Sequence, residues 1–169
     1  MRKLIVLALP VLLLTACGHT YYVVRHAEKA VQEPNMSSDV PLSDAGKQRA
    51  EDLKQWLENK KIAYVYSTPT IRTTTTAKPT ADYFKVPVQN YGPRPDSAFI
   101  VKLKGLKKNT LIVGHSNTVD DIVNGLTGAK SVPNDLAETD YNYLFMVKIK
   151  GKKASFKRYN YGKGNWDGK

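Results

Sequence analysis

The alternation of short apolar runs with longer helix-like segments constrains the fold of this chain most strongly. Apolar runs of strand length occur at residues 21–25, 62–66, 86–88 and 110–113. Segments with helical features follow them, at about residues 43–60, 71–83, 96–104 and 118–126. Strands that are separated by helices pair in parallel, with the helices covering the sheet. The pattern predicts one α/β domain over residues 21–169, a three-layer αβα sandwich with a mostly parallel central sheet.

The last part of the chain follows a different pattern. Two runs of strand length, 143–150 and 154–161, are joined at Gly151-Lys152-Lys153. A glycine-containing connection of this length is typical of a hairpin. We expect a C-terminal β-hairpin added at one side of the sheet.

The composition is basic. The chain has 169 residues with 26 Lys or Arg, 15 Asp or Glu and 41% hydrophobic residues, which gives a formal charge of +11. This balance excludes a disordered chain or a multi-span membrane protein. The positive charge indicates an anionic partner: a phosphate ester, nucleic acid or an acidic membrane surface.

The first seventeen residues have the features of an export signal. Met1-Arg2-Lys3 is basic, and the apolar run from Leu4 to Leu14 is too short to span a bilayer. The tetrad that ends at Cys17, Leu-Thr-Ala-Cys, resembles the lipobox of bacterial lipoproteins. That resemblance implies a signal peptide at residues 1–16, lipidation (palmitate) on Cys17, and a short tether over residues 17–20. A plain signal peptide, or a buried segment with a chance cysteine, is the alternative.

Arginine and histidine side chains follow three of the predicted strands. Arg25-His26 ends the first strand, Arg72 follows the second after a short loop, and His115 follows the strand at 110–113. In an open α/β sheet, ligands bind beyond the carboxyl ends of the strands. We expect these four side chains to meet at one edge of the sheet.

These residues resemble the motifs of the histidine phosphatase (phosphoglycerate mutase-like) superfamily. The segment 22–28 is similar to its Arg-His-Gly/Ala signature, and 113–117 to its Val-Gly-His strand end. Between them, 42–50 resembles the family's L-[ST]-x-x-G-x-x-[QR]-A helix, and 66–77 is similar to its S-x-x-x-x-R-[TA]-x-x-T-A stretch. The four matches occur in the family's order.

The resemblance implies a role for each residue. His26 is the expected nucleophile, and it would form a phosphohistidine that water hydrolyses. Arg25 and Arg72 would keep His26 deprotonated by like-charge repulsion. Together with His115 they would bind the phosphoryl oxygens. The reaction needs no metal or other cofactor.

The proton donor for the leaving group varies between branches of the family. One branch has an acid directly after the second histidine, where this chain has Ser116. Another branch takes it from the segment between the second arginine and the second histidine. Asp96 is the only acid between Asp82 and Asp120, so we predict it as the donor. The alternative is that Asp96 caps the helix it precedes.

The sequence therefore predicts a phosphomonoester phosphatase, exported and lipid-anchored to a bacterial membrane in the cell envelope. Its expected substrate is small and phosphorylated. Two alternatives stand beside it: a non-catalytic lipoprotein that binds phosphate or phosphoglycans, and a phosphoglycerate-mutase-type phosphotransferase. The basic, aromatic-rich segment from Lys148 to Lys169 could bind nucleic acid, but its alternating spacing favours a hairpin. We expect no nucleic-acid partner.

Overall fold

The computed structural model describes residues 18–34 and 37–162 of the chain. The predicted signal peptide and Cys17 lie outside these residues. In chain order the elements are β1 (His19–Arg25), α1 (Asp44–Leu57), β2 (Tyr64–Ser67), α2 (Ile71–Phe84), β3 (Val88–Asn90), α3 (Ser97–Leu106), β4 (Thr110–Gly114), α4 (Val119–Thr127), β5 (Tyr143–Lys150) and β6 (Lys153–Asn160).

The strands form one sheet in the order β3-β2-β4-β1-β5-β6. The first four strands of this order are parallel, and Arg25 at the end of β1 is paired with Gly114 at the end of β4. Strand β5 is antiparallel to β1, and β6 is antiparallel to β5. The mostly parallel α/β sheet and the C-terminal hairpin are confirmed.

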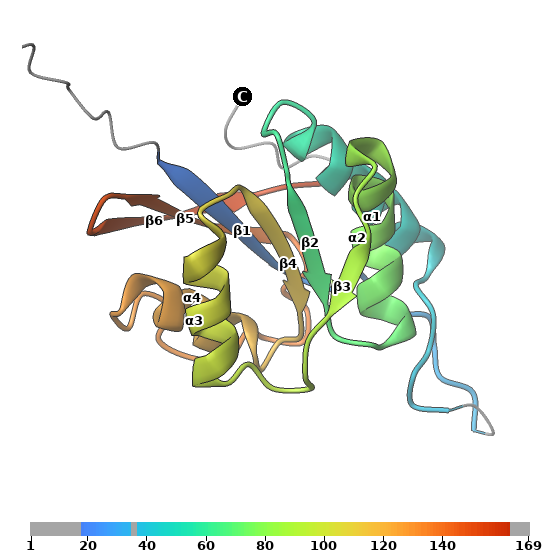
Figure 1. Ribbon diagram of the computed structural model, residues 1–169. Helices are drawn as coiled ribbons and strands as arrows, with labels where there is room; N and C mark the ends of the chain where they lie inside the picture. The colour runs from blue at the N-terminus through green and yellow to red at the C-terminus, as the bar shows by residue number, and fades with distance from the viewer. Residues whose placement is uncertain (1–17, 35–36, 163–169) are drawn as a thin grey trace, which may run out of the picture.

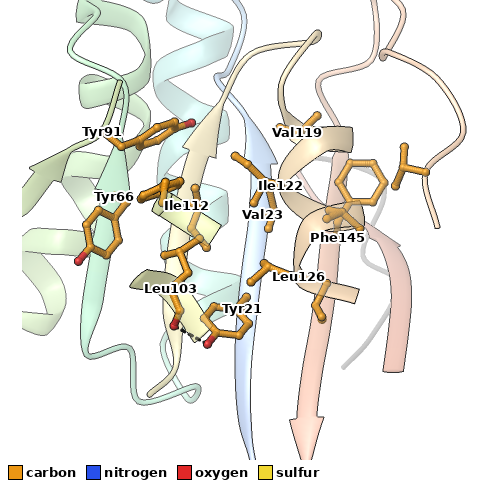
Figure 2. Packing of buried hydrophobic residues seen from close by; sticks show 14 residues of the cluster. Tyr21, Val23, Tyr66, Tyr91, Leu103, Ile112, Val119, Ile122, Leu126 and Phe145 are labelled. Atoms are coloured by element: carbon orange, nitrogen blue, oxygen red, sulfur yellow. Dashed lines mark hydrogen bonds between the residues drawn. The ribbon is translucent and has the colours of Figure 1, made fainter. Parts of the chain in front are cut away.

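Helices cover both faces of the sheet, with α1 and α2 on one side and α3 and α4 on the other (Figure 1). Side chains alternate between the faces of a strand, so β1 contributes to both layers. Tyr21 and Val23 pack in the cluster that contains Leu103 of α3 and Ile122 of α4 (Figure 2). The intervening residues of β1 pack against α1 and α2. The predicted three-layer arrangement is confirmed.

The first strand begins two residues earlier than predicted. His19 and Thr20 pair with Ile149 and Lys148 of β5, so they belong to the sheet and not to a tether. Of the predicted tether, residues 17–20, the structure describes residues 18–20. Of these three, Gly18 alone lies outside the strand. The correction shortens the distance along the chain between Cys17 and the sheet.

Other boundaries differ from the prediction by a few residues. Strands β2 and β3 each begin two residues later than predicted. Helix α1 ends at Leu57 instead of about Lys60, and Lys61 adopts a left-handed φ of 50° that no helix continues through.

Within residues 18–34 and 37–162, no helix combines the length and apolar character needed to cross a membrane.

Candidate active site

A polar cavity of about 590 Å³ lies where the parallel strands end. The register places the carboxyl ends of β1, β2 and β4 side by side, since Arg25 is paired with Gly114 and Ser67 with Val113. The residues that line the cavity are Arg25, His26, Lys29, Thr70, Arg72, Pro93, His115, Ser116, Asn117, Asp135, Leu136 and Glu138. The two arginines and two histidines predicted from the strand ends are therefore brought together.

His26 is buried, and its hydrogen bonds define which ring nitrogen is free. Its Nδ1 lies 2.8 Å from the carbonyl oxygen of Ala27. A carbonyl oxygen only accepts, so Nδ1 carries the proton and Nε2 keeps the lone pair in the neutral ring. Burial is the largest of the causes that lower the pKa of His26 to about 3, and the nearby Arg25, Arg72 and His115 contribute to the same lowering. The ring is neutral and nucleophilic across the physiological pH range.

The peptide N–H groups of His26 and Ala27 are hydrogen bonded to neighbouring elements. The His26 N–H donates to the carbonyl oxygen of Gly114 in β4 at 2.9 Å. The N–H of Ala27 donates to Thr76 Oγ1 of α2 at 3.0 Å. Thr76 is one of four consecutive threonines in α2, and its hydroxyl positions the segment that contains His26.

His115 faces His26 from the end of β4. The two ring centroids are 5.4 Å apart in an edge-to-face arrangement. The Nε2 of His115 is hydrogen bonded to Thr68 Oγ1 at 2.8 Å, and the His115 N–H donates to Thr118 Oγ1. Burial, followed by Arg72 and Arg25, lowers the pKa of His115 to about 4. His115 is therefore neutral at pH 7 and can donate one hydrogen bond to an oxyanion.

Arg25 is held by the loop between α4 and β5. Its guanidinium donates to the carbonyl oxygen of Ala137 at 2.8 Å and to Glu138 Oε2 at 2.7 Å. The guanidinium carbon lies 4.3 Å from the ring centroid of Tyr141, which stacks on it. Arg25 is only 2% exposed, so this charge is fixed beside His26. Its Nε–H has no hydrogen-bond partner among the described residues.

Arg72 lies in the first turn of α2 and is paired with a different loop. Its Nη1 is 3.4 Å from Asp39 Oδ1. Asp39 also accepts from the Ile71 N–H at 2.9 Å, so its carboxylate covers the positive end of α2. The two arginines are thus each paired with a carboxylate, Glu138 for Arg25 and Asp39 for Arg72.

The predicted proton donor is not part of the cavity. Asp96 caps α3, because its Oδ1 accepts from the Phe99 N–H at 2.7 Å. It does not line the cavity of about 590 Å³. The cap interpretation is confirmed, and the structure does not bring Asp96 to the histidines.

Sequence reasoning missed Glu138, Tyr141 and Asp39. All three lie in irregular segments, where no periodicity indicates the direction of a side chain. The available signal was chemical: a carboxylate is the expected partner for an arginine that is buried at a strand end.

Among residues 18–34 and 37–162, no three His, Cys, Asp or Glu side chains are grouped closely enough to hold a metal ion.

Comparison with family models gives one result. Residues 21–91 match the histidine phosphatase superfamily (branch 1). This segment contains Arg25, His26 and Arg72, whereas His115 follows it along the chain. A comparison with curated protein sequences finds no match.

Solved structures of histidine phosphatases and mutases share the fold. The protein histidine phosphatase SixA in complex with tungstate superposes with a TM-score of 0.64 at 18% identity, over 83% of this chain and 96% of that chain. Phosphoglycerate mutase from Bacillus anthracis gives a TM-score of 0.61 at 13% identity, over 85% and 93%. Phosphoserine phosphatase from Entamoeba histolytica in complex with phosphoserine gives 0.61 at 13% identity, over 82% and 94%.

Proposed function

We propose that this protein hydrolyses phosphomonoesters through a phosphohistidine on His26. The observation that carries the proposal is the state of His26 itself. Its Nδ1 proton is committed to the Ala27 carbonyl, so Nε2 has a free lone pair in a cavity that also contains two guanidinium groups. The family match over residues 21–91 supports the same chemistry.

The reaction has two steps. Nε2 of His26 attacks phosphorus, a P–N bond forms, and the bond from phosphorus to the leaving oxygen breaks. Water then attacks the phosphohistidine, which releases inorganic phosphate and restores His26. Arg25 and Arg72 neutralise the charge on the phosphoryl oxygens in both steps, and neutral His115 donates a hydrogen bond to one of them.

The substrate that fits this site is small and phosphorylated. The cavity of about 590 Å³ is open and polar, and its cationic side chains are Lys29 and the two arginines. By their descriptions, SixA is a protein histidine phosphatase, and the Entamoeba histolytica protein is a phosphoserine phosphatase in complex with phosphoserine. A phosphomonoester of similar size is the class we propose here.

The test compares hydrolysis of p-nitrophenyl phosphate by the full chain with that by His26→Ala. We expect the variant to lose at least about a thousandfold in kcat/KM, since removing a nucleophile removes its entire pathway. His19→Ala is the matched control, because His19 lies at the other end of β1. Equal rates for the unaltered chain and His26→Ala would contradict the proposal and favour a binding function.

We also propose that the protein is anchored in a bacterial membrane by lipid on Cys17, on the exported side. The support is the sequence pattern of residues 1–17 and the position of β1, which begins at His19. Metabolic labelling with palmitate should mark the unaltered chain and not Cys17→Ser. Because Cys17 is the only cysteine, label that remains in the variant would contradict thioether lipidation at this position.

A further inference from the structure

Two carboxylates line the cavity beside His26, Asp135 and Glu138. Of the two, Glu138 is the one that is hydrogen bonded to other residues of the cavity, Arg25 and Ser116. Its Oε2 accepts from Arg25 Nη2 at 2.7 Å, and its Oε1 accepts from Ser116 Oγ at 2.9 Å. Glu138 thus connects the residue before the nucleophile with the residue after the second histidine.

The Glu138 side chain is 70% exposed, whereas Arg25 is 2% exposed. An exposed carboxylate can exchange protons with solvent and change rotamer at little cost, while the buried guanidinium stays in place. Glu138 is therefore the movable partner in this ion pair, and Arg25 is the fixed one.

Phosphate and Glu138 compete for the same cation. Both Nη atoms of Arg25 are occupied by the loop between α4 and β5, and the Nε–H alone has no partner among the described residues. A phosphate dianion that binds Arg25 through Nη2 must approach the Glu138 carboxylate that accepts from the same nitrogen, and the two negative charges repel each other. Binding of substrate would then release the carboxylate into the cavity.

The same exchange changes the proton affinity of the carboxylate. In the free protein, Ser116, Arg25 and Lys29 hold the pKa of Glu138 below its usual value. When phosphate takes Arg25, Glu138 loses this partner and gains a like charge nearby. Both changes raise its pKa.

We propose that Glu138 is the group that carries the proton to the leaving oxygen of the substrate. This inference rests on the proposed phosphatase function. It replaces Asp96, whose carboxylate is committed to the N-terminus of α3. The acid missing at position 116 is supplied from position 138, and Ser116 holds it there.

The protons balance over the cycle. A phosphomonoester monoanion binds and gives its proton to the Glu138 carboxylate. His26 Nε2 attacks phosphorus, the P–O bond to the leaving group breaks, and Glu138 donates that proton to the leaving oxygen. In the second step Glu138 accepts a proton from the attacking water, and this proton leaves with phosphate.

The leaving group distinguishes proton donation from a structural role. p-Nitrophenolate leaves without a proton donor, whereas phenolate from phenyl phosphate is more basic and needs one. We expect Glu138→Gln to lower kcat/KM for phenyl phosphate by about a hundredfold, in the usual range for general acid catalysis. For p-nitrophenyl phosphate we expect a loss below about tenfold. Asp135→Asn is the matched control in the cavity and Asp96→Asn the control at the cap.

The outcomes separate this inference from the function on which it rests. If Glu138→Gln slows both esters equally, or if Asp96→Asn shows the leaving-group effect instead, the role of Glu138 is overturned while the phosphatase function stands. If the unaltered full chain hydrolyses neither ester, the phosphatase function itself is overturned.

A binding measurement tests the exchange at Arg25 without catalysis. Titration calorimetry with inorganic phosphate should show tighter binding to Glu138→Gln than to the unaltered chain, by about threefold or more near pH 7. The reason is that the variant lacks the competing negative charge but retains a side chain of the same shape. Equal or weaker binding by the variant would contradict the exchange.

Discussion

At the scale of single residues, the site depends on neutral histidines beside fixed cations. His26 and His115 are both held neutral, mainly by burial, with the arginines adding to the effect. The cost of burying Arg25 is offset by the Ala137 carbonyl, Glu138 and the ring of Tyr141. An imidazole ring that does not titrate near pH 7 keeps the lone pair on its Nε2 at neutral pH.

This arrangement predicts a pH dependence of stability. In the unfolded chain His26 has a pKa of about 6.5, whereas burial lowers its pKa in the folded state to about 3. As the pH falls below 6.5, the unfolded state binds a proton that the folded state does not. By pH 5 the folded state should lose about 2 kcal/mol of unfolding free energy through this residue.

Urea unfolding at pH 7 and pH 5 provides the measurement, with His26→Gln as the comparison. Glutamine does not titrate, so the variant should lose about 2 kcal/mol less than the unaltered chain over this interval. Parallel losses in the two proteins would show that His26 takes up its proton at an ordinary pKa.

The residue types at the strand ends made it possible to predict four site residues from the sequence. The residues that contact the two arginines, Glu138, Tyr141 and Asp39, could not be predicted in this way. Arg25, His26 and His115 directly follow β-branched or apolar runs, and Arg72 belongs to a recognisable motif. Glu138 lies in a connection of fifteen residues between α4 and β5 whose path depends on tertiary contacts. The sequence favours Asp96 as the proton donor because it is the only acid between Asp82 and Asp120. A single acidic residue directly before a helix is also a typical N-cap.

At the scale of elements, helix α1 is docked closely on the segment that follows His26. A Cβ added at Gly46 would overlap the backbone carbonyl of Glu28, two residues after His26. Ser43 starts the helix with its hydroxyl accepting from the Gly46 N–H at 3.1 Å, and its N–H donates to the Glu28 carbonyl. Helix α1 thus fixes the position of the segment that contains His26.

Substitution of Gly46 by alanine should therefore damage both stability and the site. Backbone atoms cannot rotate away, so the helix must shift, and we expect a loss of about 2 kcal/mol or more in unfolding free energy. Gly105→Ala in α3 is the matched control. A Cβ at Gly105 meets no atom within 4 Å, and alanine there should be neutral or stabilise by up to about 1 kcal/mol. Similar denaturation midpoints for Gly46→Ala and the unaltered chain would contradict the close docking.

Element types were predictable from sequence because the strands are short, apolar and separated by polar helices. Their ends were not, because they depend on pairing across the sheet. His19 and Thr20 are extended because β5 offers them partners, and β5 is far away in the sequence. Strand β3 is shifted because Val86 donates its N–H to the Ala81 carbonyl at the end of α2.

At the scale of the whole molecule, the two ends of β1 have different chemistry. The carboxyl end leads to the cavity that contains His26, whereas a second cavity of about 490 Å³ includes His19 at the amino end. Among the described residues, the charged side chains that line this second cavity are those of Lys104, Lys107 and Lys152, and no carboxylate lines it. Strand β1 separates the two cavities by seven residues, or about 20 Å. If Cys17 carries a lipid, the lysines face anionic headgroups and the site faces away.

Amine labelling of the full chain on anionic vesicles tests this orientation. Compared with the chain in neutral detergent, Lys104, Lys107 and Lys152 should lose reactivity on vesicles. Lys29, which is exposed in the catalytic cavity, should keep its reactivity. Protection of Lys29 with free labelling of the three lysines would indicate the opposite orientation.

The most direct test of the central claim is to trap the phosphoryl enzyme. The full chain should be mixed with p-nitrophenyl phosphate, quenched in alkali and digested for mass spectrometry. We expect one phosphoryl group on His26, stable in alkali and lost in acid, and none in His26→Ala. A phosphoryl group on another residue, or turnover of the ester by His26→Ala at an unchanged rate, would contradict the assignment of His26 as the nucleophile.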